Sequence, residues 1–191
     1  MMTIRGPVQK VNHSSARYDI GERQVSIPLC FHRFEPWPGS PIGYTYGGKT
    51  VLDANGERVF AELAILRLVQ ESGWEGVWID TFSKRLRQFM PPHSLDHLPP
   101  HAQSFLDRAN AGREWPAGCP DVFAWNEGRY LFAEAKWKNK DRIGKKQKAW
   151  VESALDSGVP LECLQIFQWD IADSYRKAEA EASGACHAAL C

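Results

Sequence analysis

The chain has 191 residues, 43% of them hydrophobic, with 23 Lys and Arg against 23 Asp and Glu. This composition excludes a disordered or collagen-like chain, and a chain of this length can bury about 70% of its unfolded surface without disulfides or a structural metal. A net charge of zero at pH 7 argues against a nucleic-acid-binding protein, although a sum does not show where the charges lie.

The five cysteines are widely spaced, without a CxxC pair and without a secretory signal ahead of them. This usage is typical of reduced thiols, so we expect a cytoplasmic protein. Residues 1–15 lack the apolar core of a signal peptide, and no stretch approaches the roughly 18 uninterrupted apolar residues of a membrane span. We therefore expect neither export nor a membrane.

Two clusters of Gly and Pro, at 36–48 and 91–100, predict long surface loops. Before the first cluster, apolar and more polar residues alternate from Val25 to Phe31, which predicts a half-buried strand. Pro28 lies inside this strand and cannot donate a ladder hydrogen bond. The strand is therefore expected near a sheet edge.

The middle of the chain predicts a helix, a strand and a short second helix. The first helix is expected over 57–72, ending at Gly73, and the strand over 74–82, which is rich in aromatic and β-branched residues. A short helix over 101–110, stopped at Gly112, should interrupt the long loop that follows.

The last third of the chain has the clearest pattern. Residues 121–125 and 129–136 predict two strands, 145–157 a helix ended by Gly158, and 161–168 a final strand. Together with the preceding elements, this gives the order helix, three strands, helix, strand.

The residues that carry chemistry lie between Asp121 and Lys136. If 127–128 form a two-residue hairpin loop, counting back along both strands sets Asp121 directly opposite Glu134. Because side chains alternate along a strand, Lys136 shares a face with Glu134. A register slip of one residue would separate these side chains.

Carboxylates in this position repel each other. Directly paired residues have Cβ atoms about 5 Å apart, and like charges there destabilise by up to about 1 kcal/mol. A hard cation such as Mg²⁺ or Mn²⁺ offsets the repulsion, because it takes oxygen ligands and often combines carboxylates with substrate phosphate. The ammonium of Lys136 could orient the attacking water or stabilise charge on the phosphate. The alternative is a solvent-facing strand of ordinary acidic and basic residues.

Two helical residues could support such a site. Glu62 lies in a helix that is apolar almost all round, so its carboxylate needs a partner, either Arg58 or the metal site. Gln147 lies on the helix stripe that faces the sheet, where it could hydrogen-bond near Lys136. Alternatively, local backbone satisfies its amide.

A basic segment follows the carboxylates. It contains seven Lys or Arg and one Asp between Lys136 and Lys148, a local charge of about +6. Positive charge at a helix N-terminus opposes the helix dipole, so attraction to phosphates explains the segment better than a solvated helix start does. The residues expected to bind the nucleic-acid backbone are Lys138, Lys140, Arg142, Lys145, Lys146 and Lys148. Trp137 could stack on a base or pack against the core.

Five short motifs follow one another in this region. They are G-x-P-D at 118–121, E-x-K at 134–136, D-R at 141–142, Q-x-x-W at 147–150 and a closing Gly158. In this order they resemble the VRR-NUC family of the PD-(D/E)xK nuclease superfamily. The ordered set is far more specific than P-D and E-x-K alone.

The resemblance implies an α/β fold of the restriction-endonuclease type, an α-β-β-β-α-β core with a mixed central sheet flanked by helices. It also implies cleavage of DNA that depends on Mg²⁺ or Mn²⁺, in repair, recombination or phage and defence biology. By position, Asp121, Glu134 and the backbone carbonyl of Ala135 would be metal ligands, and Lys136 would be the catalytic lysine.

Two helical residues are also carried over by the resemblance. Gln147 would belong to the motif-bearing helix and count among the catalytic residues, and Glu62 would be the acidic metal ligand of the first core helix. The turn at 137–140 reads Trp-Lys-Asn-Lys where the family usually has a small Gly-rich turn. This departure lies beside the site and bears on substrate preference.

The chain is expected to comprise an N-terminal extension (1–56) packed on the core, a nuclease domain (57–170) with a loop insertion at 83–112, and a C-terminal tail (171–191). The leading hypothesis is an endonucleolytic or structure-selective nuclease for duplex, flap or junction DNA, acting as a homodimer because both strands must be handled. The alternative is a non-catalytic nucleic-acid-binding or scaffold module on a nuclease fold.

Overall fold

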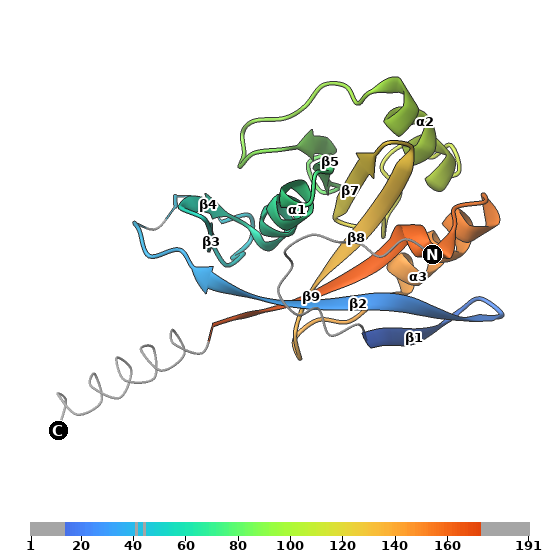
Figure 1. Cartoon of the computed structure of the whole chain (residues 1–191), viewed down its shortest axis with the longest axis horizontal. Helices are drawn as coiled ribbons and strands as arrows, with labels where there is room; N and C mark the ends of the chain where they lie inside the picture. Colours follow the sequence, from blue (N-terminus) through green and yellow to red (C-terminus); the bar gives the residue numbers. More distant parts are fainter. Residues whose placement is uncertain (1–13, 41, 44, 173–191) are drawn as a thin grey trace.

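The structure, a computed structural model, describes residues 14–172 except for 41 and 44 (Figure 1). Most of the tail predicted at 171–191 therefore lies outside the described residues. The elements in chain order are β1 (Ser14–Ile20), β2 (Arg23–Pro36), β3 (Leu52–Ala54), β4 (Glu57–Val59), α1 (Ala61–Glu71), β5 (Glu75–Asp80), β6 (Arg85–Arg87), α2 (Pro100–Ala109), β7 (Val122–Asn126), β8 (Arg129–Trp137), α3 (Lys145–Asp156), the 3₁₀ turn η1 (Leu161–Cys163) and β9 (Leu164–Ile171).

The strands of the described residues form one sheet in the order β4-β3-β2-β9-β8-β7-β5-β6, with β1 paired to the free half of β2. β9 runs parallel to both of its neighbours, and the other pairs are antiparallel. The predicted α/β class with a mixed central sheet is confirmed. The predicted order of helix, three strands, helix and strand corresponds to α1, β5, β7, β8, α3 and β9.

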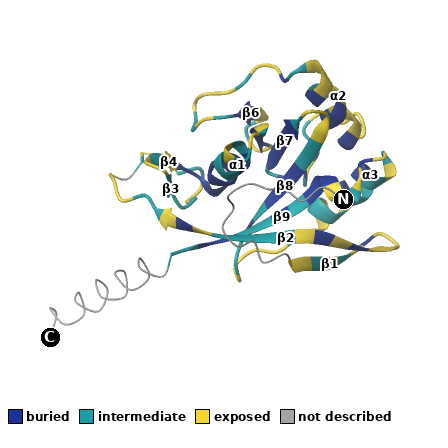
Figure 2. Cartoon of the chain, viewed as in Figure 1, coloured by how far each residue is buried: buried dark blue, intermediate teal, exposed yellow. Residues whose placement is uncertain are grey.

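Helices cover both faces of this sheet (Figure 1), and the buried residues gather along its centre (Figure 2). One apolar core lies beneath α1, and a second lies beneath α2 and α3. Alternation along β7 and β8 feeds both cores, since Val122 and Ala133 pack toward α1 while Phe123 and Phe132 pack toward α2 and α3. No helix of the described residues is long and apolar enough to cross a membrane.

The β7–β8 hairpin has the register that the sequence predicts. Trp125 pairs with Tyr130, Phe123 with Phe132, and the pairing closes at Asn126 and Arg129. The loop residues at 127–128 have φ values of 47° and 78°, the left-handed conformation that a type I′ turn requires. The two-residue loop therefore fixes which side chains meet at the far end of the hairpin.

The first predicted helix begins later than expected. α1 starts at Ala61 instead of 57, and residues 57–59 form strand β4, which pairs with β3. Asn55 and Gly56 connect the two strands with φ values of 56° and 86°. An Asn-Gly pair between short apolar runs is a strong hairpin signal, and here it overrides the helical pattern that follows.

The expectation that β2 is an edge strand is wrong. β2 pairs with β1 and β3 on one side and with β9 on the other. Pro28 lies opposite Ser15 of β1, one residue before pairing with β9 begins at Leu29. The missing N–H of the proline therefore falls where β9 has not yet joined the sheet, and an interior strand can accept it.

Other boundaries moved by a few residues. β9 begins at Leu164 instead of 161, because residues 161–163 form the 3₁₀ turn. The stretch from 83 to 112 contains the predicted helix as α2 and also the short strand β6, which pairs with β5.

Candidate active site

Asp121 lies immediately before β7, at the end of the sheet where β5 and β8 are its neighbours. Its backbone carbonyl accepts a hydrogen bond from the N–H of Ile79 at 2.7 Å. Its side-chain Oδ2 accepts a second one from the N–H of Ala135 at 2.9 Å. These two bonds hold the carboxylate beside Glu134, which the hairpin register places opposite it.

Glu134 and Lys136 come from alternate positions of β8, and each is only 6% exposed. The Nζ of Lys136 lies 2.8 Å from Oε1 of Glu134 and 3.3 Å from Oδ2 of Asp141. Gln147 of α3 donates its Nε2 to the same Oε1 of Glu134, while its own Oε1 accepts the N–H of Gly144 at 2.9 Å. Both sequence-based interpretations of Gln147 therefore hold together.

Gly118 allows α3 to come this close. Its φ is +88°, and a Cβ at this position would lie 2.2 Å from the backbone oxygen of Lys146 and 2.6 Å from the backbone nitrogen of Gln147. Backbone atoms of a helix cannot yield to such an overlap. The first glycine of the G-x-P-D motif is thus explained by the docking of the first turn of α3.

Glu62 of α1 is a third carboxylate of this cluster, and it is buried, at 9% exposed. Its Oε1 forms an ion pair with Lys49 instead of the predicted alternative Arg58. Its Oε2 is buried and has no hydrogen-bond partner among the described residues. The Lys49 ammonium also lies 5.0 Å from the ring centroid of Trp78. Sequence reasoning missed Lys49, for which the only signal was a lysine directly after two loop glycines.

The electrostatics of the cluster are unfavourable for Asp121. Burial, then repulsion by Glu134 and Glu62, raises its pKa well above the ordinary value, although the Ala135 N–H and the charge of Lys49 oppose this. Burial also raises the pKa of Glu134, against the attraction of Lys136. The acidic groups are therefore held together at a cost that their basic neighbours only partly offset.

Lys136 behaves differently because its charged form is favoured. Burial lowers the pKa of its ammonium, but Glu134 and then Asp141 outweigh burial and raise it on balance. The ammonium therefore stays protonated through neutral pH, as a fixed positive charge beside the carboxylates.

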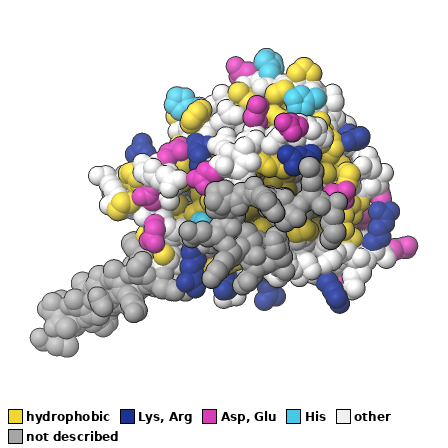
Figure 3. Space-filling view, viewed as in Figure 1, with side chains coloured by type: hydrophobic (Ala, Val, Ile, Leu, Met, Phe, Trp, Pro, Cys, Tyr) yellow, Lys and Arg dark blue, Asp and Glu magenta, His cyan; other side chains and the backbone are white. Residues whose placement is uncertain are grey.

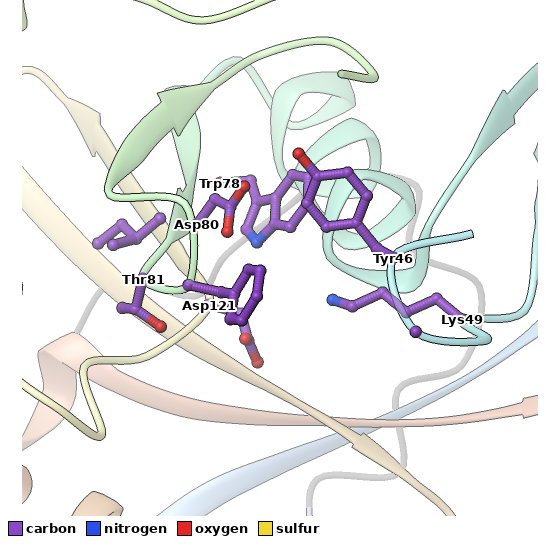
Figure 4. Close-up of a pocket in the computed structure, with 9 residues that line it drawn as sticks. Tyr46, Lys49, Trp78, Asp80, Thr81 and Asp121 are labelled. Carbon is purple, nitrogen blue, oxygen red and sulfur yellow. The ribbon is translucent and has the colours of Figure 1, made fainter. Parts of the chain in front are cut away.

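Two cavities meet at Lys49. Asp121 lines a cavity of about 400 Å³ together with Tyr46 and Trp78, and Figure 4 shows the Lys49 ammonium directed into it. Glu62 lines a second cavity of about 360 Å³. Lys49 belongs to the linings of both cavities. Both lie on the α1 side of the sheet.

Glu134 lies on the opposite side, where it lines a small space with Gln147 and Val151 under α3. The sequence analysis places Asp121 and Glu134 on one face of the sheet. In the structure the pairing of β7 with β8 ends at Val122 and Ala133, while β8 continues beside β9 to Trp137. Asp121 lines the cavity on the α1 side, and Glu134 lines the space under α3. Asp121 can turn this way because it precedes the strand and is free of the alternation that fixes β7.

The basic segment divides into two parts. Lys140 places its Nζ 3.6 Å from the ring centroid of Trp137 and lines the Glu62 cavity, and Lys138 lies 4.6 Å from the ring of Phe31. The other basic residues lie on the following loop and the start of α3, where Arg142, Lys145 and Lys146 are exposed and Lys148 is half-buried. In the view of Figure 3, Lys and Arg are spread around the molecule with Asp and Glu among them.

Trp137 packs within the protein. Its ring stacks on that of Trp169 with centroids 4.6 Å apart, and its Nε1 donates to Oδ1 of Asp170 at 3.2 Å. The Trp137 ring is therefore contacted by two residues of the same chain, Trp169 and Lys140. Of the two interpretations of this residue, the contacts favour packing.

The oxygen donors beside the start of β7 suit a hard cation. They are the carboxylates of Asp121 and Glu134, to which the predicted ligand set would add the backbone carbonyl of Ala135. Within the described residues, no three His, Cys, Asp or Glu side chains converge into a metal cluster. Mg²⁺ does not require one, since it commonly binds through one or two carboxylates and keeps several waters. The unpartnered Oε2 of Glu62 is a further donor close to Asp121.

A family model described as the VRR-NUC domain matches residues 64–167, more than half of the 191 residues. A search of curated proteins found no match. The matched range contains Asp121, Glu134, Lys136 and Gln147, begins two residues after Glu62, and does not include Lys49.

Proposed function

The chain belongs to the VRR-NUC family, and from this premise we propose that it hydrolyses phosphodiester bonds in DNA with a divalent metal ion, Mg²⁺ or Mn²⁺. The observation that carries the proposal is the close approach of Asp121, which is half-buried, to the buried Glu134. Burial raises the pKa of both groups, so the fold keeps them together against their preference for water. A cation bound between the two carboxylates would offset their repulsion.

Asp121, Glu134 and the carbonyl of Ala135 would hold the ion, with Glu62 as a further acidic group beside them. When bound, the ion supplies polarisation of a phosphodiester oxygen and lowers the pKa of a water molecule. Asp121 would be oriented for this role by the N–H of Ala135, which binds one of its two carboxylate oxygens. The β8 backbone thus both orients one ligand and provides another.

Lys136 would orient the attacking water or stabilise negative charge that develops on the phosphate. Its raised pKa keeps it charged, and Asp141 holds its ammonium from the solvent side. Gln147 is a positioning residue, because it donates to the carboxylate oxygen of Glu134 and so fixes the orientation of that group.

The basic segment would bind the DNA backbone through Lys138, Lys140, Arg142, Lys145, Lys146 and Lys148. Such contacts carry no sequence information and weaken steeply with salt. We extend the proposal to an endonucleolytic or structure-selective activity on duplex, flap or junction DNA by a cytoplasmic protein in repair, recombination or defence. A homodimer would let the two strands be cut by two copies.

The test is a panel of end-labelled linear, flap, junction and single-stranded DNA, incubated with the full chain and Mg²⁺ or Mn²⁺. We expect cleavage that excess EDTA abolishes and that Asp121→Asn and Lys136→Ala each reduce by about a hundredfold or more. The matched control is Asp156→Asn, the same change at a half-exposed carboxylate far from the site. Cleavage that persists in both site variants, or in EDTA, would reject the mechanism.

The same panel separates the alternative of a non-catalytic binding module. That alternative predicts salt-sensitive DNA binding without any cleavage by the wild-type chain in either metal. It also predicts that Asp121→Asn strengthens DNA binding, because removing a negative charge eases the approach of phosphate. The variant, like wild type, would cut no DNA.

A further inference from the structure

Next to the proposed site, the turn between β5 and β6 presents an aromatic ring to solvent. Phe82 is 86% exposed, yet it lines the same cavity of about 400 Å³ as Asp121. A single exposed apolar residue is ordinary on a protein surface. Here the residue lines a cavity that also contains Asp121, so the chemistry of its surroundings decides what it could bind.

The turn that carries Phe82 is held by buried charges. Oδ1 of Asp80 accepts the N–H of Ser83 at 3.0 Å, and its Oδ2 lies 2.8 Å from Nε of Arg87. The side chains of this ion pair are at most 5% exposed. The Arg87 guanidinium also donates to the hydroxyl of Tyr46 at 3.0 Å. The ring of Phe82 therefore projects from a fixed base, so binding to it orders little additional chain.

The chemistry around the ring is aromatic and basic. Tyr46 and Trp78 line the same cavity, with ring centroids 6.2 Å apart. Lys49 also lines the cavity, and two exposed cations lie close in sequence, Lys84 at the end of the turn and Arg85 at the start of β6. Aromatic rings that stack on bases, combined with cations that attract phosphates, are what single-stranded nucleic acids bind.

We propose that Phe82 stacks on an unpaired nucleobase next to the phosphodiester that is cut, with the Tyr46 and Trp78 cavity receiving that base. The inference rests on the proposed function, which supplies the DNA and the position of the cut. Inside a continuous duplex the faces of a base are covered by its neighbours, so only a flap, frayed end or bulge offers one. The cavity lies within the range of about 300 to 1,000 Å³ typical of small-molecule sites.

The binding test uses the full chain in excess EDTA, so that no DNA is cut. Two oligonucleotide duplexes carry the fluorescent base 2-aminopurine at the same position, once paired and once unpaired at the foot of a flap. We expect wild type to quench the unpaired base and to bind the flap at least about fivefold more tightly than Phe82→Ala does. Phe82→Trp should retain both effects.

Phe89→Ala is the matched control. Phe89 is also exposed, at 58%, and lies in the same stretch of chain, but its ring contacts Arg67 outside the cavity. In the presence of Mn²⁺, we expect Phe82→Ala to lower the ratio of flap to duplex cleavage by at least about fivefold and Phe89→Ala to leave it unchanged.

Equal effects of the two alanine variants, or no quenching by wild type, would overturn the nucleobase site. Quenching by wild type that Phe82→Ala removes supports it, even where no substrate is cut in either metal. Quenching by wild type without cleavage in either metal would overturn the proposed hydrolysis but not the nucleobase site, so the two failures are distinguishable.

Discussion

The cavity beside β5 contains two carboxylates with opposite environments, the buried Asp80 and the half-buried Asp121. Asp80 is matched to Arg87, whose three nitrogens reach Oδ2 of Asp80, the carbonyl of His93 at 2.7 Å and the hydroxyl of Tyr46. Asp121 instead faces Glu134 and Glu62, and its pKa is raised by burial and by both neighbours. One carboxylate has a full set of complementary partners, and the other has like charges.

The difference separates what stabilises this fold from what equips it for chemistry. A buried ion pair with every donor used fixes a loop in one geometry, and removing one partner is costly. A buried pair of like charges lowers stability and gives the molecule a place where an added cation is favourable. The two networks therefore predict changes of opposite sign on substitution.

The largest change is expected from Arg87→Ala. It leaves Asp80 buried without its counter-charge and removes the anchor of the β5–β6 turn, so the free energy of unfolding should fall by about 3 to 5 kcal/mol. Urea unfolding followed by tryptophan fluorescence measures it. The double variant Asp80→Ala with Arg87→Ala should recover part of the loss. A single-variant loss below about 1 kcal/mol would mean that the ion pair does not fix this region.

A smaller change of opposite sign is expected from Asp121→Asn in EDTA. The amide keeps an acceptor for the Ala135 N–H but removes the repulsion, so stability should rise by about 1 kcal/mol. The folded state holds the Asp121 proton more tightly than the unfolded chain does, whose Asp titrates near pH 3.9, and ionisation therefore costs stability as the pH rises.

The gain from Asp121→Asn should accordingly grow between about pH 4 and neutrality. The same urea titrations at several pH values, with Asp156→Asn as the control, measure this dependence. A loss of stability at neutral pH would show that the Asp121 carboxylate stabilises the fold, and would contradict the expectation that its like-charged neighbours lower stability.

The smallest change is expected from Arg23→Ala, which tests a third kind of pair. Arg23 lies 2.6 Å from Asp156, but the two side chains are 56% and 53% exposed. Solvent screens such a pair, so the free energy of unfolding should change by at most about 0.5 kcal/mol. A larger loss would mean that exposure is a poor guide to the worth of the ion pairs in this protein.

The part of the site that could be predicted from sequence is the part set by local rules. A two-residue turn and strand alternation place Glu134 opposite Asp121 and Lys136 beside it, and helical periodicity directs Gln147 to the sheet. These rules act over a few residues, so counting along the chain is sufficient. The pairing of β7 with β8 confirms the register.

The remainder depends on contacts between distant segments. Lys49 reaches Glu62 from an irregular loop that has no period to place it, and Tyr46 reaches Arg87 from the same loop across 41 positions. The strand at 57–59 was missed although a local signal marks it, since Asn55 and Gly56 form its hairpin turn. Pro28 shows the converse error, because the position of a proline in a sheet depends on where the neighbouring strand begins.

The glycine at 118 also has a mechanical consequence. Because residue 118 has no side chain, the segment before β7 packs directly against the backbone of Lys146 and Gln147 in the first turn of α3. The methyl group of an alanine would overlap these backbone atoms, so we expect it to displace the first turn of α3 and to weaken the hydrogen bond from Gln147 to Glu134. Residue 118 carries no charge, yet it sets how closely α3 approaches and therefore how Gln147 meets Glu134.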